Sequence, residues 1–391
     1  MRKRLLALLI LVMPFHVMAQ NETLTSELDS ISTIISGFRN IKSHINLEFA
    51  SSANAYFTDG DFDEASYKIN RVRLEIYGRL NRNLSYNFRQ SFNRYSNPYS
   101  VDNLSSSIEY ANITWHQSDR FELVAGKQFV AHAGYEGYVN ALRVREFCDF
   151  NNNVEVYQTG LMGIIHFTPT QQLILQVTNN RSASDQEIYL YGLPDGVAPA
   201  KVPLLATANW NGWFADGSVH LMYSASAGQL AQGNNIYYLM CGNIYEKGPV
   251  LAYLDVLYSR GGIDAQQRIT SLQGQSWGIL PTTVKNTEYL TFIANVDYQF
   301  HPKWNAYVKG VYETAGVYES NGRFDKGRYI TSWNAQACLE WFPFNEDKGF
   351  RVFAHYLYKG YELSENTKAL NAYIPDTQRF SLGIVYIIPV L

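Results

Sequence analysis

Four arginines occupy positions of the same parity in one short region of the chain. Arg71, Arg73 and Arg79 alternate with apolar residues, and Arg89 follows a tight reversal at residues 81–83. A period of two places these guanidinium groups on one face of a β-hairpin, opposite an apolar face. Guanidinium groups stay charged at physiological pH and attract anions. The row therefore predicts either the charged lining of a wet channel or an ordinary solvated face whose arginines pair with nearby carboxylates.

Arg143 and Arg145 form a second basic pair within a long polar segment, residues 130–154. The same segment contains three acids, Glu136, Glu146 and Asp149. Two positions for this pair remain open, namely a constriction inside a channel and an outer loop that contacts only solvent. On the other predicted strands, parity gives the lumen charged residues of both signs. We therefore expect the arginines of the hairpin to face acids across the lumen and to produce at most a mild preference for anions.

Other kinds of chemistry leave no clear signal. The sequence contains no glycine-rich phosphate loop, nucleotide fingerprint or metal cluster, so we expect no cofactor and no metal. Cys148, Cys241 and Cys338 are an odd, scattered set that predicts neither a disulfide framework nor a zinc site. A Ser-His-acid triad cannot be recognised from spacing, because its geometry defines it. The formal net charge of −3 argues against a nucleic-acid partner.

Alternating polar and apolar residues continue from about residue 43 to the end of the chain, in roughly sixteen strands. Many of these strands exceed the roughly 5–6 residues that are usual in soluble sheets. The clearest apolar faces are Leu290, Phe292, Ala294, Val296, Tyr298 and Phe300; Trp333, Ala335, Ala337, Leu339 and Trp341; and Phe380, Leu382, Ile384, Tyr386 and Ile388. We expect the apolar faces to contact lipid and the polar faces to line an aqueous lumen.

Connections between the predicted strands alternate between short and long. Residues 81–83 form one of the short connections, whereas residues 58–66, 130–154 and 228–235 are among the long ones. Outer-membrane barrels have short periplasmic turns and long outer loops, and a soluble sandwich has no reason to sort its loops in this way. The sequence therefore predicts a transmembrane antiparallel β-barrel, with a binding or adhesion barrel and a barrel hydrolase as alternatives to an open channel. Conductance measurements would separate these functions.

The N-terminal region divides into two predicted segments before the barrel. Residues 1–19 combine basic residues, an apolar run and small residues, which is typical of a secretory signal peptide. Residues 20–40 carry an apolar heptad seam, which predicts a periplasmic amphipathic helix or a short coiled coil. Residues 41–391 are predicted to form the outer-membrane β-barrel.

Parts of the chain resemble a known family of porins. Residues 71–80 (RVRLEIYGRL) and 84–88 (LSYNF) are similar to the early hairpin of the phosphate-selective porin O and P family. Residues 122–129 (ELVAGKQF) and 157–163 (YQTGLMG) resemble its strands on either side of the third outer loop.

This resemblance implies a sixteen-stranded porin in the outer membrane of a Gram-negative bacterium, surrounded by outer-membrane lipid and usually a homotrimer. It also implies a third outer loop that folds inward, and passive diffusion of small polar solutes through a water-filled channel. Whether these solutes include anions such as phosphate remains open from the sequence.

Overall fold

The computed structural model describes residues 42–93, 101–139, 143–275, 280–322, 324–344 and 349–390. The predicted signal peptide, residues 1–19, and the predicted helix, residues 20–40, lie outside the described residues.

Sixteen strands account for most of the described chain. Their bounds are β1 Lys42–Thr58, β2 Asp61–Arg79, β3 Leu84–Ser91, β4 Ile108–Ser118, β5 Phe121–Phe129, β6 Tyr157–Thr168, β7 Gln171–Asn179, β8 Leu204–Phe214, β9 Val219–Ala231, β10 Asn234–Lys247, β11 Val250–Ile263, β12 Lys285–His301, β13 Trp304–Val317, β14 Gly327–Trp341, β15 Phe350–Leu363 and β16 Thr377–Pro389. Short helices lie in the connections: α3 Tyr135–Tyr138, α4 Asp149–Asn153, α5 Asp185–Ile188, the 3₁₀ helix η1 Thr270–Gln275 and α6 Glu365–Lys368.

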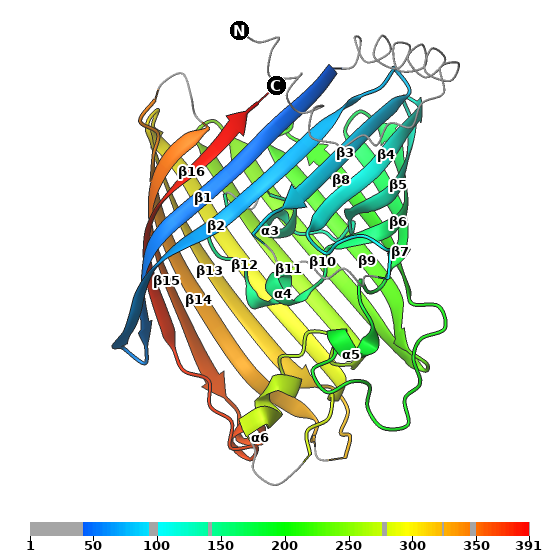
Figure 1. Cartoon of the computed structure of the whole chain (residues 1–391), viewed down its shortest axis with the longest axis vertical. Coiled ribbons are helices and arrows are strands. Elements are labelled where there is room, and N and C mark those ends of the chain that lie inside the picture. Colours follow the sequence, from blue (N-terminus) through cyan, green and yellow to red (C-terminus); the bar gives the residue numbers. More distant parts are fainter. Residues whose placement is uncertain are drawn as a thin grey trace, which may run out of the picture. The chain divides into compact units, whose positions relative to one another are not determined.

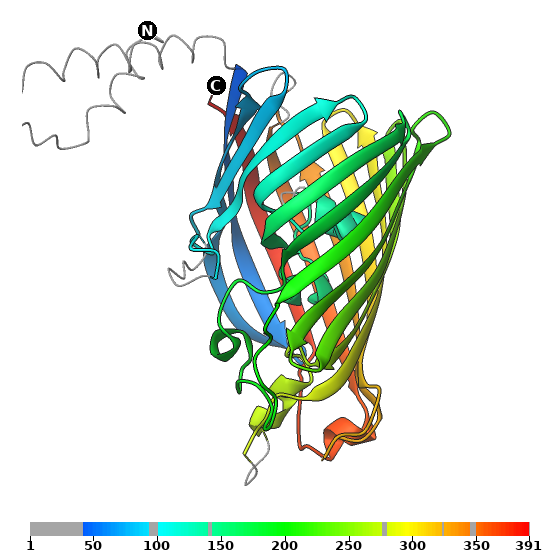
Figure 2. The same cartoon turned by 90° about the vertical axis from the view of Figure 1, so that its right-hand side faces the viewer.

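The strands close into one antiparallel barrel in sequence order. β1 pairs with β16, and Phe49 lies opposite Tyr386 in this closing register. Figure 1 places the short turns at the end where β16 finishes, and α5 and α6 at the other end. Figure 2 shows the strands inclined to the long axis, as closure of a barrel requires. The predicted sixteen-stranded antiparallel barrel is confirmed.

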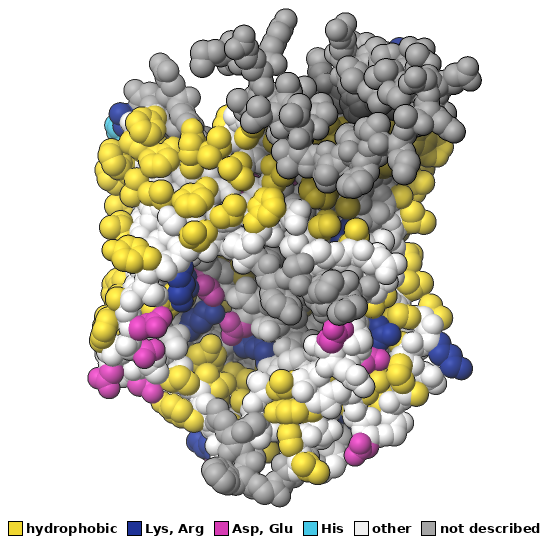
Figure 3. Space-filling model, in the orientation of Figure 1, with side chains coloured by type: hydrophobic (Ala, Val, Ile, Leu, Met, Phe, Trp, Pro, Cys, Tyr) yellow, Lys and Arg dark blue, Asp and Glu magenta, His cyan; other side chains and the backbone are white. Residues whose placement is uncertain are grey.

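The two faces of the wall differ as the alternation predicts. On β12, Phe292 and Val296 are exposed on the outer face, whereas Thr291 and Asn295 are buried on the inner face. In Figure 3, hydrophobic side chains cover the upper part of the visible wall, and charged side chains gather in a hollow below. Within the described ranges, no helix has the length and apolar character needed to cross a bilayer.

Two of the connections predicted to be long are tight turns. β1 ends at Thr58 and β2 begins at Asp61, so residues 58–66 do not form a loop. Asp59 and Gly60 both have positive φ, 53° and 92°, as a type I′ hairpin turn requires. β9 and β10 are likewise joined through Gly233, which has a φ of 73°. The barrel wall therefore extends further at the end that carries the long connections than the alternation of polar and apolar residues predicts.

One sector of the inner wall is apolar, which differs from the expected polar lumen. Met240, Leu257 and Ile293, from β10, β11 and β12, point inward and are almost fully buried. Phe150 of α4 packs into the same hydrophobic cluster. Burying one phenylalanine side chain contributes roughly 1.5–3 kcal/mol. An apolar inner sector thus gives the connection between β5 and β6 a surface on which to fold inward.

Candidate functional site

The connection between β5 and β6, called the third loop here, folds into the barrel from its first residues. The Ala131 N–H donates to the side chain of Gln176 on β7 (2.7 Å), and the Ala131 carbonyl accepts from Asn209 on β8 (2.8 Å). The Ala133 N–H donates to Ser224 on β9 (2.8 Å). Three successive strands therefore supply polar side chains that replace water around the loop backbone and direct it across the inner wall.

Helix α3 is attached to the far wall by a buried ion pair and by backbone hydrogen bonds. The N–H groups of Tyr135 and Glu136 donate to the two carboxylate oxygens of Asp255 on β11, each at 2.9 Å. The Lys309 Nζ on β13 lies 2.6 Å from the Glu136 carboxylate, which is fully buried. Burial raises the pKa of Glu136, but Lys309 and the donors Asn151 and Cys148 outweigh it, so the pKa lies below its usual range. Glu136 is therefore an ionised anchor.

Helix α4 is attached in a similar way. The N–H groups of Asp149 and Phe150 donate to the Glu313 carboxylate on β13, at 3.0 and 2.9 Å. Asp149 also pairs with Lys359 on β15 (3.1 Å) and with Arg268 (3.2 Å). The Asp149 carboxylate thus lies at the start of helix α4, next to the cationic groups of Lys359 and Arg268, which compensate its negative charge.

Glu146 completes the set of loop acids that have cationic partners. Its carboxylate lies 3.2 Å from Lys359 Nζ and 3.0 Å from an Arg379 nitrogen on β16. Three acids of the loop, Glu136, Glu146 and Asp149, are thus paired with bases of the barrel wall. The mixed charge of the loop serves mainly to attach it and does not by itself make the channel acidic.

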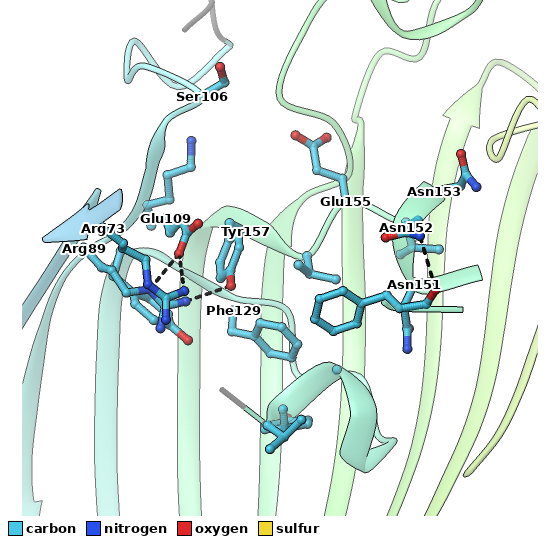
Figure 4. Close-up of a pocket in the computed structure, with 18 of the residues that line it drawn as sticks. Arg73, Arg89, Ser106, Glu109, Phe129, Asn151, Asn152, Asn153, Glu155 and Tyr157 are labelled. Atoms are coloured by element: carbon cyan, nitrogen blue, oxygen red, sulfur yellow. Dashed lines mark hydrogen bonds and ion pairs between the residues drawn. The ribbon is translucent and has the colours of Figure 1, made fainter. Parts of the chain in front are cut away.

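Two cavities lie between the third loop and the wall formed by β15, β16 and β1–β6. The larger has a volume of about 490 Å³ and is bordered by β2–β6, and the smaller, of about 240 Å³, is bordered by β1, β2, β15 and β16. They share Arg71, Phe147 and Asn152. Figure 4 shows the larger cavity, with Arg73 and Arg89 on one side and Asn151, Asn152 and Asn153 on the other.

Basic side chains outnumber acidic ones around these cavities. The basic residues are Arg71, Arg73, Arg89, Lys127, Arg145 and Arg379, and the acidic residues are Glu109, Glu146 and Glu155. Glu48, Asp102 and Glu340, which pair with Arg73, Lys127 and Arg145, offset part of this excess. Because the walls have a low dielectric constant, the basic groups that face the cavities raise the local concentration of anions.

Two of the predicted arginines lie within a carboxylate cluster on their own wall. Arg73, 2% exposed, lies 2.5 Å from Glu48 and 3.2 Å from Glu109. Arg89 pairs with Glu109 at 2.8 Å, donates to the Tyr157 hydroxyl at 2.7 Å and lies 3.8 Å from Glu75. We expected these arginines to face acids across the lumen. The structure instead places their acidic partners on neighbouring strands, so much of their charge is neutralised within the wall.

The other four predicted residues have different surroundings. Arg71 is half-buried and borders both cavities. Arg79 is exposed beside the turn at residues 81–83, and Arg143 is exposed on the third loop. Arg145 pairs with Glu340 on β14, and its guanidinium lies 4.1 Å from the centre of the Phe353 ring. The structure thus brings Arg71 and Arg145 together around the smaller cavity, whereas Arg79 lies at the mouth.

A comparison with sequence models of known families shows which family this barrel belongs to. The sequence model of the family described as "Phosphate-selective porin O and P" matches residues 44–388, nearly the whole described barrel. The chain belongs to this family. It is therefore an outer-membrane porin of a Gram-negative bacterium, which forms a channel for small polar solutes. A search of curated protein sequences found no significant match.

Solved structures share the fold of this porin at low sequence identity. The outer membrane channel DcaP of Acinetobacter baumannii is 11% identical, with a TM-score of 0.60 over 90% of this chain and 98% of that chain. OmpT of Vibrio cholerae, in its trimer form, is 11% identical, with a TM-score of 0.52 over 89% and 99%. OmpF of Salmonella typhi, in complex with daunomycin, is 12% identical, with a TM-score of 0.52 over 89% and 97%.

Sequence reasoning missed several residues around the porin's cavities. Arg379 on β16 and Lys127 on β5 both border them, and Lys127 pairs with Asp102 at 3.3 Å. The alternation along β16 could have indicated Arg379, because Arg379 lies on the face opposite to the apolar residues Phe380 and Leu382. The parity of Lys127 is ambiguous beside Gly126, whose φ of 119° disturbs the strand.

A hydrogen-bonded chain of Ser85, His116 and Glu122 also could not be predicted from the spacing of these residues in the sequence. The Ser85 hydroxyl lies 2.9 Å from His116 Nε2, and His116 Nδ1 lies 3.1 Å from Glu122. Its connectivity is that of a Ser-His-acid triad, but these residues border neither of the two charged cavities. We therefore attribute the chain to packing of polar groups near the short-turn end of the porin.

The ionised state of Glu136 predicts how the porin responds to acid. A carboxylate with a lowered pKa stabilises the folded loop fully above its ordinary pKa of 4.5, and this stabilisation disappears as the pH falls through the lowered value. We expect a rise in single-channel conductance, from loop release, as the pH falls well below 4.5. Planar-bilayer recordings across the acid range measure it, and Glu136→Gln should flatten the rise. The absence of any rise below pH 4.5 would contradict this assignment.

Proposed function

We propose that this porin favours small anions, inorganic phosphate among them, over cations. The observation that carries the proposal is the excess of basic side chains around the two cavities, six basic against three acidic. The third loop fills the apolar side of the lumen, so solutes pass along the wall formed by β15, β16 and β1–β6. This wall presents Arg71, Arg145 and Arg379 around the smaller cavity, where Glu146 is the acidic lining residue.

The preference follows from where these charges lie. Arg73 and Arg89 share Glu48, Glu75 and Glu109, so this cluster adds little net positive charge. Arg71 borders both cavities, so an anion that moves from one to the other remains close to its guanidinium. A guanidinium binds phosphate oxygens through a planar fork of donors. We therefore infer that Arg71 is the residue on which anion passage depends most.

The proposal predicts that phosphate competes with chloride for the same passage. In planar bilayers with potassium chloride, the chloride permeability should exceed that of potassium, and millimolar phosphate should reduce the chloride current in a saturable manner. Because oxyanions bind through charge and hydrogen bonds, raising the ionic strength should weaken the block. Sulfate serves as a control for oxyanion shape. Equal permeability of potassium and chloride, with no effect of phosphate, would exclude an anion preference.

We also propose that the porin is a homotrimer in outer-membrane lipid, with residues 1–19 removed on export and residues 20–40 in the periplasm before the barrel. The family and the trimer form of Vibrio cholerae OmpT support this assembly. Crosslinking of the porin in intact outer membranes should give a band of three subunits. Monomers alone, under conditions that crosslink a known trimer, would exclude it.

A further inference from the structure

A third cavity, of about 320 Å³, lies beside the larger charged cavity and has a different chemical character. It is bordered by residues near both ends of the third loop, by β6, β8, β9, β10 and the end of β7, and by the connections that follow β7 and β11. Eight carboxamide side chains line it: Asn152, Asn153, Gln158, Asn179, Asn180, Gln229, Gln266 and Gln267. The cavity shares residues 152–155 with the larger charged cavity, so a solute can contact both. We call it the amide cavity.

Two of these amides are buried without a full set of partners. Gln266 is 3% exposed; its Nε2 donates to Ser259 (3.3 Å), and its Oε1 has no hydrogen-bond partner among the described residues. Gln158 is also 3% exposed, and its side-chain amide has no hydrogen-bond partner among the described residues. A buried amide without partners costs about 1–3 kcal/mol. Buried amides that line a cavity therefore indicate a site whose hydrogen bonds are completed by a solute or by water.

The charged groups at this cavity already have partners. The Glu155 carboxylate accepts the Ser182 N–H at 3.1 Å, and Arg181 forms an ion pair with Asp185. Burial lowers the pKa of His132 to about 4, so this imidazole is neutral at physiological pH. The cavity thus offers many neutral donors and acceptors and little uncompensated charge, in contrast to the arginine-lined passage next to it.

Apolar and aromatic side chains form the rest of the lining. Tyr189 and Tyr238 are 3% and 7% exposed, and Ile188, Leu205 and Leu230 border the cavity with them. Such surfaces fit the C–H faces of a sugar ring, whereas amides fit its hydroxyl groups, each of which both donates and accepts. A volume of about 320 Å³ is at the lower end of the range for small-molecule sites, roughly 300–1,000 Å³.

We propose that the amide cavity is a binding site for a neutral, hydroxyl-rich solute of the size of a small saccharide. The proposal rests on the proposed function in one respect, namely that the porin forms an open channel. It deepens that function by adding a neutral solute class beside the anions. A saccharide bound here lies against the entrance to the charged cavity and obstructs ion flow through it.

The test uses maltose as the probe on the full-length porin in planar bilayers. Maltose added on the long-loop side should reduce the chloride current along a saturation curve. A polyethylene glycol of similar hydrodynamic size, which lacks the ring hydroxyl groups, should reduce it only in proportion to concentration. Gln158→Met keeps the side-chain volume and removes the amide, so it should raise the half-blocking maltose concentration about tenfold, as expected for losing hydrogen bonds to a polar ligand.

The matched control is Gln128→Met. Gln128 is directly opposite Gln158 in the register of β5 and β6, is 2% exposed and is not part of the lining of the amide cavity. The Gln128→Met variant should leave the maltose block unchanged. Both variants should retain the chloride conductance and the phosphate block of the unmodified porin. Open channels with a phosphate block but no saturable maltose block would overturn this site alone. Equal maltose affinity in Gln158→Met and the unmodified porin would also overturn it, whereas loss of all conductance would refute the proposed function.

Discussion

Replacing Lys309 with methionine is expected to raise the single-channel conductance severalfold. The change leaves the fully buried Glu136 carboxylate without the ammonium group that lies 2.6 Å from it. Removing one partner of a buried ion pair costs about 3–5 kcal/mol, because the remaining charge stays desolvated. This cost shifts the balance between the attached and released loop by a factor of roughly a hundred to several thousand. Released residues 130–154 no longer narrow the lumen, so larger solutes also enter in liposome-swelling assays.

The matched control for this prediction removes both charges. In the double variant Lys309→Met with Glu136→Gln, a neutral amide still accepts from the Cys148 N–H and the Asn151 side chain, which now donate to Glu136 at 3.1 and 2.7 Å. Its conductance should fall back toward that of the unmodified porin, giving a coupling energy between the two sites. If Lys309→Met leaves conductance and swelling rates unchanged, the ion pair does not hold the loop in place.

Replacing Arg71 with glutamine is expected to produce the largest loss of anion preference among single substitutions. Removing one unit charge about 4 Å from a passing ion changes its energy by roughly 1 kcal/mol even at the dielectric constant of water, a factor of about five in occupancy. The effect acts on anions and cations in opposite directions, so the permeability ratio changes more than either permeability. Reversal potentials in a tenfold gradient of potassium chloride measure this ratio, with the largest shift at low salt.

Arg79→Gln is the matched control because Arg79 lies on the same strand with the same parity. Arg79 is exposed near the short-turn mouth and borders neither charged cavity. Its replacement should shift the reversal potential only slightly, because water and salt screen a charge at the mouth. Equal shifts for the two variants would indicate that overall lumen charge sets the preference, and would remove the special role of Arg71.

The strands could be predicted because each obeys a local rule. A wall with lipid on one face and water on the other imposes a period of two on every membrane-crossing segment, as on β12 and β16. The rule fails where both faces meet water. The first residues of β2, 61–66, are mostly exposed, with Phe62 at 60% exposure, so they carry no alternation and were predicted to be a loop. The Asp59-Gly60 turn was the signal that could have corrected this.

The site could be predicted only in part. The arginines of β2 and β3 were found because strand parity determines which face they occupy. The acidic partners of these arginines could not be predicted, because strand parity does not show which side chains on neighbouring strands lie within hydrogen-bond distance. Glu48 lies on β1, and Glu109 lies where the register between β3 and β4 shifts, near Arg89. These two carboxylates decide that Arg73 and Arg89 contribute less positive charge to the lumen than their number indicates.

The sequence by itself determined the barrel, its approximate strand number and the side on which most long connections lie, because these depend on residues close together in the chain. Only the tertiary structure decided how the third loop divides the lumen. Its anchors join residues far apart in sequence, such as Glu136 with Lys309 and Glu146 with Arg379. Barrel closure brings these residues together, and burial makes their pairing energetically necessary. The two charged cavities consequently lie along the wall that carries Arg71, which a list of charged residues cannot reveal.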